Sequence, residues 1–310
     1  MITKYLVLLA YFAILFVIGI VSSKKIKSVS DFFVGGKKLG YWVVAFSARA
    51  TGESGWLLLG LTGMGAMMGL KAMWVVAGEV LGVALCWWFM AKPFKRFTDK
   101  HESITIPDYL VSRFKPVTNH LRILAALVLT VFVTIYVSAQ IDATGLAFET
   151  FFGWNYFVGA LAGFGIVVFY IFSGGFVAVA WSDLFQGIMM LLGLVVLPIV
   201  GYFSLASFGK TDGLLTGLAA VDPALVTFWG EGGATLMNAM GIIGFLMIGV
   251  GFLGSPQIFV RFMSIKDEAE INKGRWVAIG FTILTDASAV FAGMIGRYLL
   301  TSPASQAVGV

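Results

Sequence analysis

The sequence predicts an all-α polytopic membrane protein, and three observations support this class. Of the 310 residues, 59% are hydrophobic and only 12% are charged, whereas soluble domains carry about 25% charged residues. The apolar stretches are continuous rather than alternating, and they are long enough to cross a bilayer, which needs roughly 20 apolar residues. The 38 glycines and 28 phenylalanines fit helices that pack closely through small residues.

Eight apolar stretches predict eight transmembrane helices. In chain order they cover about 5–21, 41–70, 73–91, 122–145, 155–178, 182–205, 235–260 and 276–300. The first is too long for a signal-peptide core and has no small-residue cleavage site, so we expect it to remain in the protein. The fifth and sixth meet in a tight turn at Ser173, Gly174 and Gly175, and a polar loop over about 206–234 precedes the seventh.

The basic residues indicate how the chain crosses the membrane. Most of the 21 lysines and arginines follow the first, third and seventh spans, whereas Lys4, Lys71 and Lys210 lie in the connections on the other side. Because cytoplasmic connections are enriched in Lys and Arg, we expect the N-terminus outside, in the plasma (inner) membrane. The formal charge of +5 therefore reflects topology, and we expect no nucleic-acid partner.

The second span is interrupted near its middle by polar and small residues. Arg49, Thr51, Gly52, Glu53 and Ser54 lie within six positions of an otherwise apolar run. Each ionised side chain at the bilayer centre costs roughly 2.5–3.5 kcal/mol on insertion scales. An uninterrupted helix has no use for such groups, whereas a broken helix whose free backbone faces a cavity can use them to bind an ion or a solute.

The seventh span has a comparable interruption, because residues 249–257 contain three glycines and a proline. Serine is a favoured N-cap and proline a favoured first helical residue. We therefore expect the helix to break near 250–254 and to restart at Pro256, with Ser255 as its cap. Two interrupted helices that are five spans apart and run in opposite directions are typical of secondary transporters with inverted repeats. Close packing of glycine-rich helices is the alternative interpretation.

Several charged residues lie within the predicted spans. Arg49 and Glu53 are four residues apart, so a continuous helix would place them on one face. We interpret Arg49 as a structural counterion and Glu53 as a candidate cation ligand or proton acceptor. Glu79, Asp286 and Arg297 also fall within spans, and the sequence does not indicate their partners.

Motifs along nearly the whole chain resemble the solute:sodium symporter family, and they are closest to its sodium/proline symporter branch. In chain order they are FFVGG (32–36), SARATGESGWLL (47–58), TIPDY (105–109), TIY (134–136), SGGFVAVAWSD (173–183) and PQIFVRFM (256–263). The resemblance implies the leucine-transporter-type fold of two inverted five-helix repeats. It divides the chain into an extra first helix with a cytoplasmic loop (1–40), a first repeat (41–205), an external loop (206–234) and the first two helices of the second repeat (235–310).

The resemblance also implies the residues of a transport site. Ala50 and Glu53 match contributors to the family's main sodium site, and Asp183 matches an acidic residue linked to sodium passage or to a second sodium site. The alternative for Asp183 is an anion at the cytoplasmic start of the sixth span, where the helix dipole favours negative charge. The positions that match the lining of the solute cavity are Ser54, Gly55, Trp56, Tyr136, Ile248, Phe252 and Ser255.

We therefore expect a sodium-coupled symporter that imports a small organic solute, such as an amino acid or a short carboxylate, by alternating access. A proton is the alternative coupling ion, because Glu53 stands where the branch has an uncharged residue and Gly52 where it has an aspartate. The branch also has an aromatic residue at the position of Ile248, which argues against proline itself as the solute. We expect no organic cofactor and no enzymatic activity, since the sequence shows no nucleophile–base pair and no metal-binding motif.

The resemblance places further core helices beyond residue 310, including the one that completes the sodium site. We therefore expect this chain to be the N-terminal part of a longer transporter that needs the missing C-terminal helices. The alternatives are a transporter-like sensor module of a larger protein and an inactive truncated fragment. The residues after 310 discriminate between them, because further spans alone favour transport and a soluble kinase favours sensing.

Overall fold

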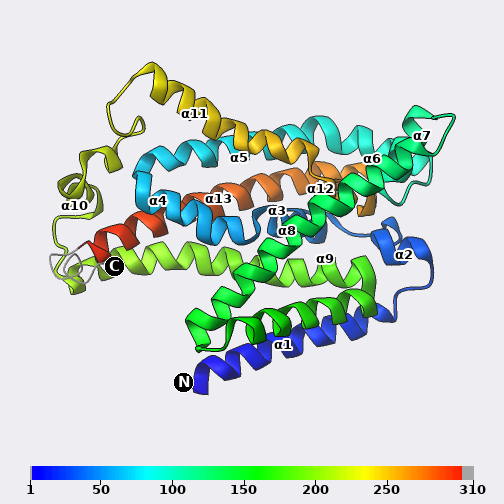
Figure 1. Ribbon diagram of the computed structural model, residues 1–310, viewed down its shortest axis with the longest axis horizontal. Coiled ribbons are helices and arrows are strands. Elements are labelled where there is room, and N and C mark those ends of the chain that lie inside the picture. Colours follow the sequence, from blue (N-terminus) through cyan, green and yellow to red (C-terminus); the bar gives the residue numbers. More distant parts are fainter. Residues whose placement is uncertain (1, 302–310) are drawn as a thin grey trace. The chain divides into compact units, whose positions relative to one another are not determined.

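The computed structural model describes residues 2–301, and every regular element in that range is helical apart from one isolated bridge between Leu39 and Ile265. The chain forms two compact units. Within the described residues, unit 1 comprises the chain up to Thr51 together with 91–186 and 256–274, and unit 2 comprises 52–90, 187–255 and the chain from Arg275 onward. Figure 1 shows the helices and their order along the chain.

Six helical stretches of the described chain are long and apolar enough to cross a membrane. They are Ile2–Ser23, Tyr41–Lys100, His120–Phe152, Tyr156–Phe208, Leu236–Gly254 and Glu268–Leu300. The second has 60 residues and the fourth has 53, whereas one crossing needs roughly 20. Each of these two contains a glycine with positive φ at which the chain turns, Gly69 at 58° and Gly175 at 51°. The six stretches are therefore compatible with the eight predicted spans.

Unit 1 contains helices from three separate stretches of the chain. They are α1 (Ile2–Ser23), α2 (Val29–Val34), most of α3 (Tyr41–Gly55), α6 (Ala91–Lys100), α7 (Ile106–Phe114), α8 (His120–Phe152), the first part of α9 (Tyr156–Ser204), α12 (Pro256–Ser264) and the start of α13 (Glu268–Leu300). In Figure 1, α9 forms two arms, because the chain reverses at Gly175. This reversal confirms the tight turn predicted at 173–175.

Unit 2 contains the remaining helices and the remaining parts of α3, α9 and α13. Its own elements are the π-helical turn η2 (Trp56–Leu61), α4 (Thr62–Met68), α5 (Met73–Leu85), α10 (Leu214–Val221), α11 (Leu236–Ile248) and the 3₁₀ segment η7 (Gly249–Gly254). Its core joins buried Leu57, Leu61 and Val75 to Val290 and Met294 of α13. Each unit contains segments of both predicted repeats, so the division into units does not coincide with the division into repeats. The division into repeats therefore remains a proposal.

Two short helices of unit 1, α2 and α7, begin at side-chain caps that the sequence supplies. The hydroxyl of Ser28 accepts from the N–H of Asp31 at 3.1 Å, and that of Thr105 accepts from the N–H of Asp108 at 3.2 Å. The Ser28 hydroxyl and the Lys27 N–H donate to the Asp31 carboxylate, and these bonds lower the pKa of Asp31. The ionised Asp31 carboxylate therefore stabilises α2 fully at a pH above the ordinary pKa of aspartate. This stabilisation is lost as the pH falls through the lowered pKa of Asp31.

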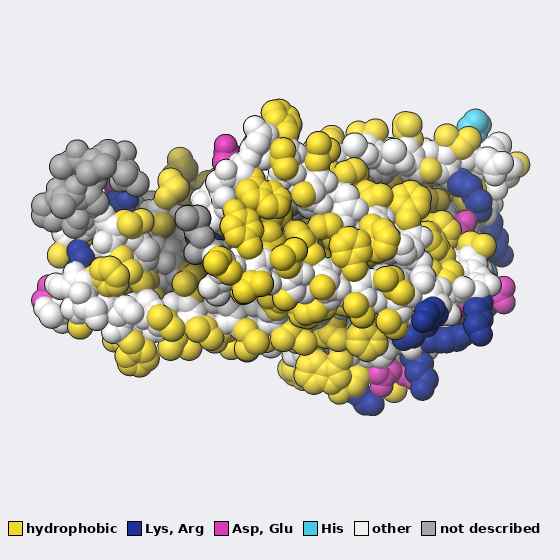
Figure 2. Space-filling model, turned by 90° about the horizontal axis from the view of Figure 1, so that it is seen from below, with side chains coloured by type: hydrophobic (Ala, Val, Ile, Leu, Met, Phe, Trp, Pro, Cys, Tyr) yellow, Lys and Arg dark blue, Asp and Glu magenta, His cyan; other side chains and the backbone are white. Residues whose placement is uncertain are grey.

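The surface is strongly apolar. Hydrophobic side chains cover most of the face shown in Figure 2. On α8, large apolar residues such as Ile123, Leu127 and Phe132 are exposed. A soluble monomer rarely exposes contiguous apolar patches of this kind, whereas lipid is an apolar solvent for them. The surface therefore agrees with the predicted membrane class.

Candidate functional site

The first predicted interruption lies at the end of α3. Ser54 has φ 47° and ψ −155°, and the helix continues beyond Gly55 as the π-helical turn η2 rather than as an α-helix. The backbone N–H of Trp56 points to the Ser54 hydroxyl at 3.5 Å. The interruption is confirmed, and it centres on Ser54.

The backbone of Ser54 leads to a testable prediction. Its φ and ψ fall in a region that is populated almost only by glycine and that costs roughly 1–3 kcal/mol for other residues. We expect Ser54→Gly to raise the free energy of unfolding by about 1 kcal/mol, because the long Ser54–Trp56 contact contributes little. Thermal unfolding of the purified protein in detergent measures this effect.

The matched control is Ser138→Gly in the regular part of α8, where Ser138 is exposed. Glycine is less favourable than serine in a helix interior, since it lies about 0.8–1.0 kcal/mol below alanine on the propensity scale, so this variant is expected to be less stable than the wild type. A lower unfolding temperature for Ser54→Gly would contradict the strain at this position.

The second predicted interruption lies between α11 and α12. After Ile248 the chain narrows to the 3₁₀ segment η7, and α12 restarts at Pro256 as expected. Ser255 has an extended backbone, and its hydroxyl donates to the carbonyl of Gly251 at 3.2 Å. Ser255 thus occupies the predicted cap position. Its hydroxyl also provides a hydrogen-bond donor for the Gly251 carbonyl, which lies within the interrupted segment.

Glycines hold η7 against α5 in unit 2. A Cβ atom added to Gly82 would collide with the backbone of Gly249, and one added to Gly249 would collide with the backbone of Gly78. The two segments therefore meet backbone to backbone, which only glycine permits. Because the backbones touch at these glycines, the residues that flank them on α5 and η7 are brought close together.

A pocket of about 370 Å³ lies in unit 2 where both interruptions contribute side chains. Its lining residues are Trp56, Glu79, Ile248, Gly251, Phe252 and Ser255. Trp56 immediately follows the break in α3, whereas Ile248, Phe252 and Ser255 surround the break at η7. The structure thus brings four of the predicted solute-contacting residues together. Ser54 and Gly55 belong to the adjoining turn and do not belong to this lining.

Glu79 completes the pocket from α5. Its side chain is fully buried, and its Oε1 accepts a hydrogen bond of 2.9 Å from the Trp56 indole N–H. The bond fixes the position of the carboxylate beside the aromatic wall of the pocket. The sequence showed Glu79 only as a charge within a span, because nothing in its immediate neighbours indicates that α5 faces the second interrupted helix.

Glu53 lies in unit 2 beside α13. It is fully buried, and the hydroxyl of Thr285 lies 3.1 Å from its Oε1 and 3.2 Å from Asp286 Oδ1. Thr285 and Asp286 are also fully buried. The sequence placed Glu53 and Asp286 in different spans without indicating that one hydroxyl, that of Thr285, lies close to both. Arg49 is likewise buried, on the part of α3 that belongs to unit 1.

Unit 1 contains a buried polar cluster centred on Arg261 of α12. Its Nη2 lies 2.8 Å from Asp183 Oδ2 and 2.5 Å from the Thr51 hydroxyl. Its Nε donates to the Ser47 hydroxyl at 2.8 Å, and Nη1 donates to the carbonyl of Gln257 at 2.7 Å. The Ser47 hydroxyl donates in turn to Asp183 Oδ2 at 2.5 Å. The guanidinium therefore ties α12 to α3 and α9.

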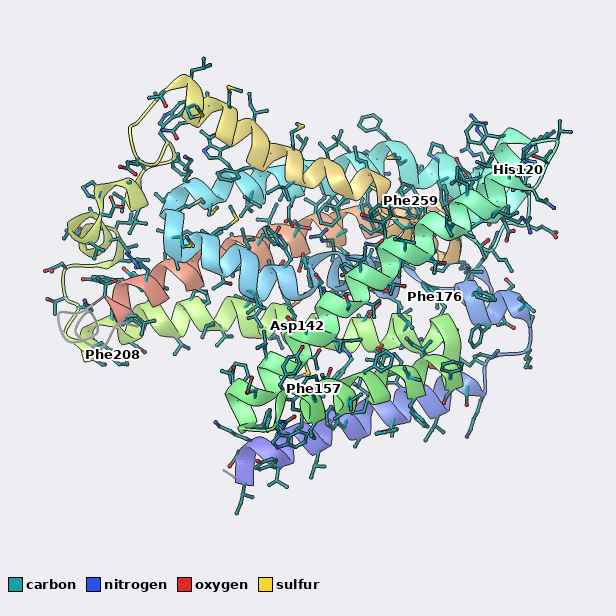
Figure 3. The ribbon with its side chains drawn as sticks, in the orientation of Figure 1. His120, Asp142, Phe157, Phe176, Phe208 and Phe259 are labelled. Carbon is teal, nitrogen blue, oxygen red and sulfur yellow. The ribbon has the colours of Figure 1, made fainter. Side chains whose placement is uncertain are left out.

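The surroundings of this cluster explain its burial. Phe176, labelled in Figure 3, directly follows Gly175 on α9, and its ring centroid lies 5.6 Å from the Arg261 guanidinium carbon. The side chains of Arg261 and Asp183 are only 6% and 14% exposed. The Tyr136 hydroxyl donates to the carbonyl of Thr51 at 3.0 Å, just before the break in α3. Tyr136 and Asp183 thus both reach α3 within unit 1.

Asp183 has an environment that the sequence did not predict. Its carboxylate pairs with Arg261, so a sodium ion approaching Oδ2 would compete with the guanidinium for that oxygen. It also lies about two turns beyond Gly175, where the second arm of α9 begins. A helix dipole acts mainly within the first turn. The alternative interpretation as a helix-start anion is therefore wrong, because this arm begins earlier than the predicted residue 182.

Arg261 was read from the sequence only as one of the positive charges that follow the seventh span. The signal that could have singled it out is its position in the PQIFVRFM motif, directly after the helix restarts. Ala50, which was predicted to contribute a backbone carbonyl to a sodium site, is half-buried near the end of α3. No described group of three or more His, Cys, Asp or Glu side chains is arranged to hold a metal ion.

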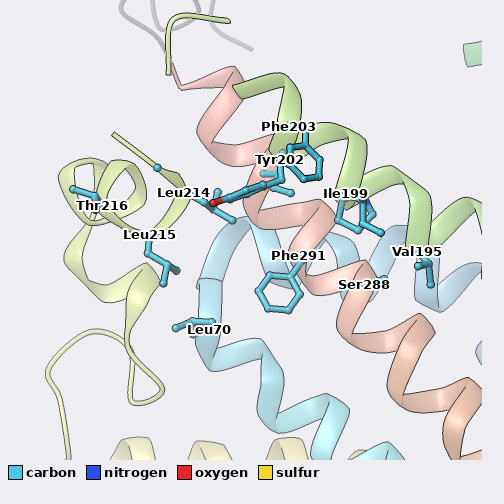
Figure 4. Close-up of a pocket in the computed structure, with 13 residues that line it drawn as sticks. Leu70, Val195, Ile199, Tyr202, Phe203, Leu214, Leu215, Thr216, Ser288 and Phe291 are labelled. Atoms are coloured by element: carbon cyan, nitrogen blue, oxygen red, sulfur yellow. The ribbon is translucent and has the colours of Figure 1, made fainter. Parts of the chain in front are cut away.

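A larger cavity of about 740 Å³ lies elsewhere in unit 2, between α9, α10 and α13. Figure 4 shows its wall, which includes the rings of Tyr202, Phe203 and Phe291 and the branched side chains of Ile199 and Leu214. Its described lining residues carry no charge and include none of the predicted site residues. The smaller pocket beside Glu79 therefore matches the predicted solute cavity better than this larger one.

Two interrupted helices, in a chain whose helices are long enough to cross a membrane, are typical of secondary transporters. The arrangement of the helices is that of the leucine-transporter-type fold. A solved structure of a Na⁺-coupled sialic acid symporter, in a substrate-bound outward-open state, matches 96% of this chain and 61% of its own chain, with a TM-score of 0.80 at 21% identity. The chain belongs to the sodium:solute symporter family, whose family model matches residues 32–309.

Curated relatives agree with this assignment. The high-affinity proline transporter PutP of Bacillus subtilis (strain 168) is 37% identical over 280 residues, which are 90% of this chain and 58% of the relative. A sodium/proline symporter of Staphylococcus aureus (strain NCTC 8325 / PS 47) is 35% identical over 294 residues, which are 94% of this chain and 56% of the relative. The predicted family and fold are confirmed, and the family consists of transporters rather than enzymes.

Proposed function

We propose that the protein is a sodium-coupled symporter that imports a small organic solute across the plasma membrane by alternating access. Membership of the sodium:solute symporter family supports sodium as the coupling ion. The relatives named as sodium/proline symporters make amino acids the first solutes to test. This chain spans 56–58% of the length of those relatives. In a transporter as long as those relatives, further segments would be available to contribute residues to the ion and solute sites.

The observation that carries the proposal is the pocket of about 370 Å³ to which both interrupted helices contribute. Side chains from unrelated parts of the chain converge there, namely Trp56 after the first break and Phe252 within the second. Interrupted helices leave backbone polar groups free to bind an ion or a solute group in the middle of a membrane. The solute is proposed to occupy this pocket, with Ser54 and Gly55 as further contributors.

The coupling ion is proposed to bind near the first interruption. Glu53 would supply a carboxylate oxygen and Ala50 a carbonyl oxygen, since sodium, like other hard cations, prefers oxygen ligands. The Thr285 hydroxyl lies 3.1 Å from the Glu53 carboxylate and supports its position. Asp183 is proposed to take part in sodium passage, in exchange with Arg261, and Arg49 to balance buried negative charge as a counterion.

Uptake into proteoliposomes that contain the purified full-length protein tests this function. A sodium gradient is expected to drive accumulation of at least one member of a panel of labelled amino acids and short carboxylates. Replacing sodium with choline at fixed pH is expected to abolish that accumulation. Uptake that follows a pH gradient without sodium would identify the proton as the coupling ion. Uptake that needs neither gradient would contradict symport.

Glu53→Gln tests the proposed cation ligand. The substitution keeps the size of the side chain and removes its charge, so the sodium concentration for half-maximal uptake is expected to rise at least about tenfold, which corresponds to about 1.4 kcal/mol. The control is Glu231→Gln in the external loop, where the glutamate is exposed, and it is expected to leave the sodium dependence unchanged. An unaltered sodium dependence in Glu53→Gln would remove Glu53 from the coupling mechanism.

A further inference from the structure

Unit 1 has a pocket of its own, which shares no lining residue with the proposed solute pocket. Its volume is about 490 Å³, and its walls come from α1, α8 and both arms of α9. Phe12, Phe148, Phe164 and branched aliphatic side chains form most of these walls. None of the described lining residues carries a charge, so a charged molecule would lose its hydration there without gaining a counterion. The lining suits an uncharged and largely apolar ligand.

The helices around this pocket pack closely at two glycines. A Cβ atom added to Gly163 of α9 would collide with the side chain of Thr144 on α8. One added to Gly19 of α1 would lie 3.1 Å from the Cβ atom of Tyr170 on α9, which is a tight contact. The first arm of α9 therefore packs against both α1 and α8, and Figure 1 shows it running alongside α1. Because Thr144 and Tyr170 also line the pocket, its walls belong to tightly packed helices.

Two side chains of the pocket have hydrogen-bonding groups without a hydrogen-bond partner among the described residues. They are the hydroxyl of Tyr11 on α1 and the amide of Gln186 on the second arm of α9. The ring of Tyr11 stacks on that of Phe185, the residue before Gln186, with ring centroids 6.1 Å apart. The two polar groups therefore belong to adjoining parts of the wall. The hydroxyl of Thr144, by contrast, donates to the carbonyl of Gln140 within α8.

Both groups lie far from the ends of their helices. Tyr11 is near the centre of α1, and Gln186 follows Gly175, where the second arm of α9 begins, by eleven residues. Eleven residues of α-helix rise about 16 Å, which is roughly half of the 30 Å hydrocarbon core. A polar group left without a hydrogen bond at this depth is costly. A phenol O–H and an amide N–H both donate, and one carbonyl oxygen has two lone pairs with which to accept from both.

We propose that this pocket binds an uncharged lipophilic carbonyl compound from the membrane, whose oxygen accepts hydrogen bonds from Tyr11 and Gln186. Its volume of about 490 Å³ falls within the range of roughly 300–1,000 Å³ that is usual for small-molecule sites. The aromatic walls contact the hydrocarbon part of the ligand. The site is separate from solute transport, and it does not depend on the proposed symport function.

Two tritiated probes that differ only in a carbonyl group test this site. They are 9-fluorenone, a planar aromatic ketone, and fluorene, in which a methylene group replaces the carbonyl. Binding is measured on the purified full-length protein in lipid nanodiscs, and binding to empty nanodiscs of the same lipid is subtracted. One net hydrogen bond changes affinity roughly two- to tenfold. With two such bonds, fluorenone is expected to bind saturably and at least about fivefold more tightly than fluorene.

Two variants assign this preference to the named side chains. Tyr11→Phe removes the hydroxyl and keeps the stacked ring, and Gln186→Leu removes the amide and keeps a side chain of similar size. Each is expected to weaken fluorenone binding about two- to tenfold and to leave fluorene binding unchanged, and the double variant is expected to bind both probes equally. Tyr202→Phe, at an exposed tyrosine of unit 2, is the control and is expected to alter neither. Comparable unfolding temperatures establish that each variant is folded.

Three outcomes would overturn the proposal. The first is the absence of saturable fluorenone binding above that of empty nanodiscs. The second is equal binding of the two probes to the unmodified protein, which would identify the pocket as a site for hydrocarbon such as a lipid chain. The third is a preference for fluorenone that survives in the double variant. Sodium-driven uptake is measured separately, so its presence or absence decides the symport function and leaves the assignment of this pocket unaffected.

Discussion

Replacing Arg261 with alanine is expected to lower the free energy of unfolding by about 3–5 kcal/mol, because the substitution leaves Asp183 as a buried carboxylate without its counterion. The two side chains are 6% and 14% exposed, and their charged atoms lie 2.8 Å apart. Four hydrogen bonds from the guanidinium connect α12 to itself, to α3 and to α9. Denaturant or thermal unfolding in detergent measures the loss.

The exposed pair Arg96–Glu268 provides the matched control. Its charged atoms also lie 2.8 Å apart, but the two side chains are 72% and 38% exposed. Water and salt screen such a pair, so Arg96→Ala is expected to cost no more than about 1 kcal/mol. A similar effect of both substitutions would show that burial does not strengthen the dependence of Asp183 on Arg261.

A double substitution separates the ion pair from its individual charges. Replacing Arg261 with methionine and Asp183 with leucine together removes both charges and retains apolar volume. The double variant is expected to be more stable than Arg261→Met alone, because no uncompensated charge remains. The double variant could instead lose more free energy of unfolding than the two single variants lose together. That result would mean that Ser47 and Thr51, rather than the opposite charge, decide the stability of the cluster.

Replacing Gly82 with alanine is expected to separate η7 from α5 and to abolish solute binding. The added methyl group would overlap the backbone of Gly249, which has no flexible end that can move aside. Overpacking of this kind typically costs about 1–3 kcal/mol. Because Glu79 lies on α5 and Phe252 on η7, any separation also changes the pocket that both residues line. Equilibrium binding and thermal unfolding measure the two effects.

Gly244→Ala is the control for this substitution. Gly244 lies in α11, and a methyl group added there meets open space. Alanine is about 1 kcal/mol more favourable than glycine within a helix, so this variant is expected to keep solute binding and to be at least as stable as the wild type. Unchanged binding in Gly82→Ala would mean that the backbone contact between α5 and η7 does not position the pocket.

The local features of the chain were predictable because their causes are local. Glycine, serine and proline alter the backbone at their own positions, so the breaks near Ser54 and at 249–256 could be expected from residue type alone. The reversal at Gly175 follows from the same rule, since its φ of 51° suits glycine. The sequence predicted that the second arm of α9 begins near residue 182, whereas it begins directly after Gly175. The prediction was wrong because the chain is apolar on both sides of the turn, so that hydropathy does not mark where the new helix starts.

The pairing of distant charges was not predictable from spacing. Arg261 and Asp183 are separated by 78 positions, and Trp56 and Glu79 by 23. The rule that relates residues three or four positions apart applies only within one helix. It therefore suggested a role for Arg49 beside Glu53 and could not suggest that the Thr285 hydroxyl meets the Glu53 carboxylate from α13.

The sequence by itself determined the membrane class, the two interrupted helices and the family, because these depend on composition and on short motifs whose effects are local. The tertiary structure alone decided that Arg261 neutralises Asp183 within unit 1 and that Glu79 joins Trp56 and Phe252 in the pocket of unit 2. The physical reason is that a buried charge needs a partner close in space. That partner is set by helix packing, which glycines such as Gly82 and Gly249 permit.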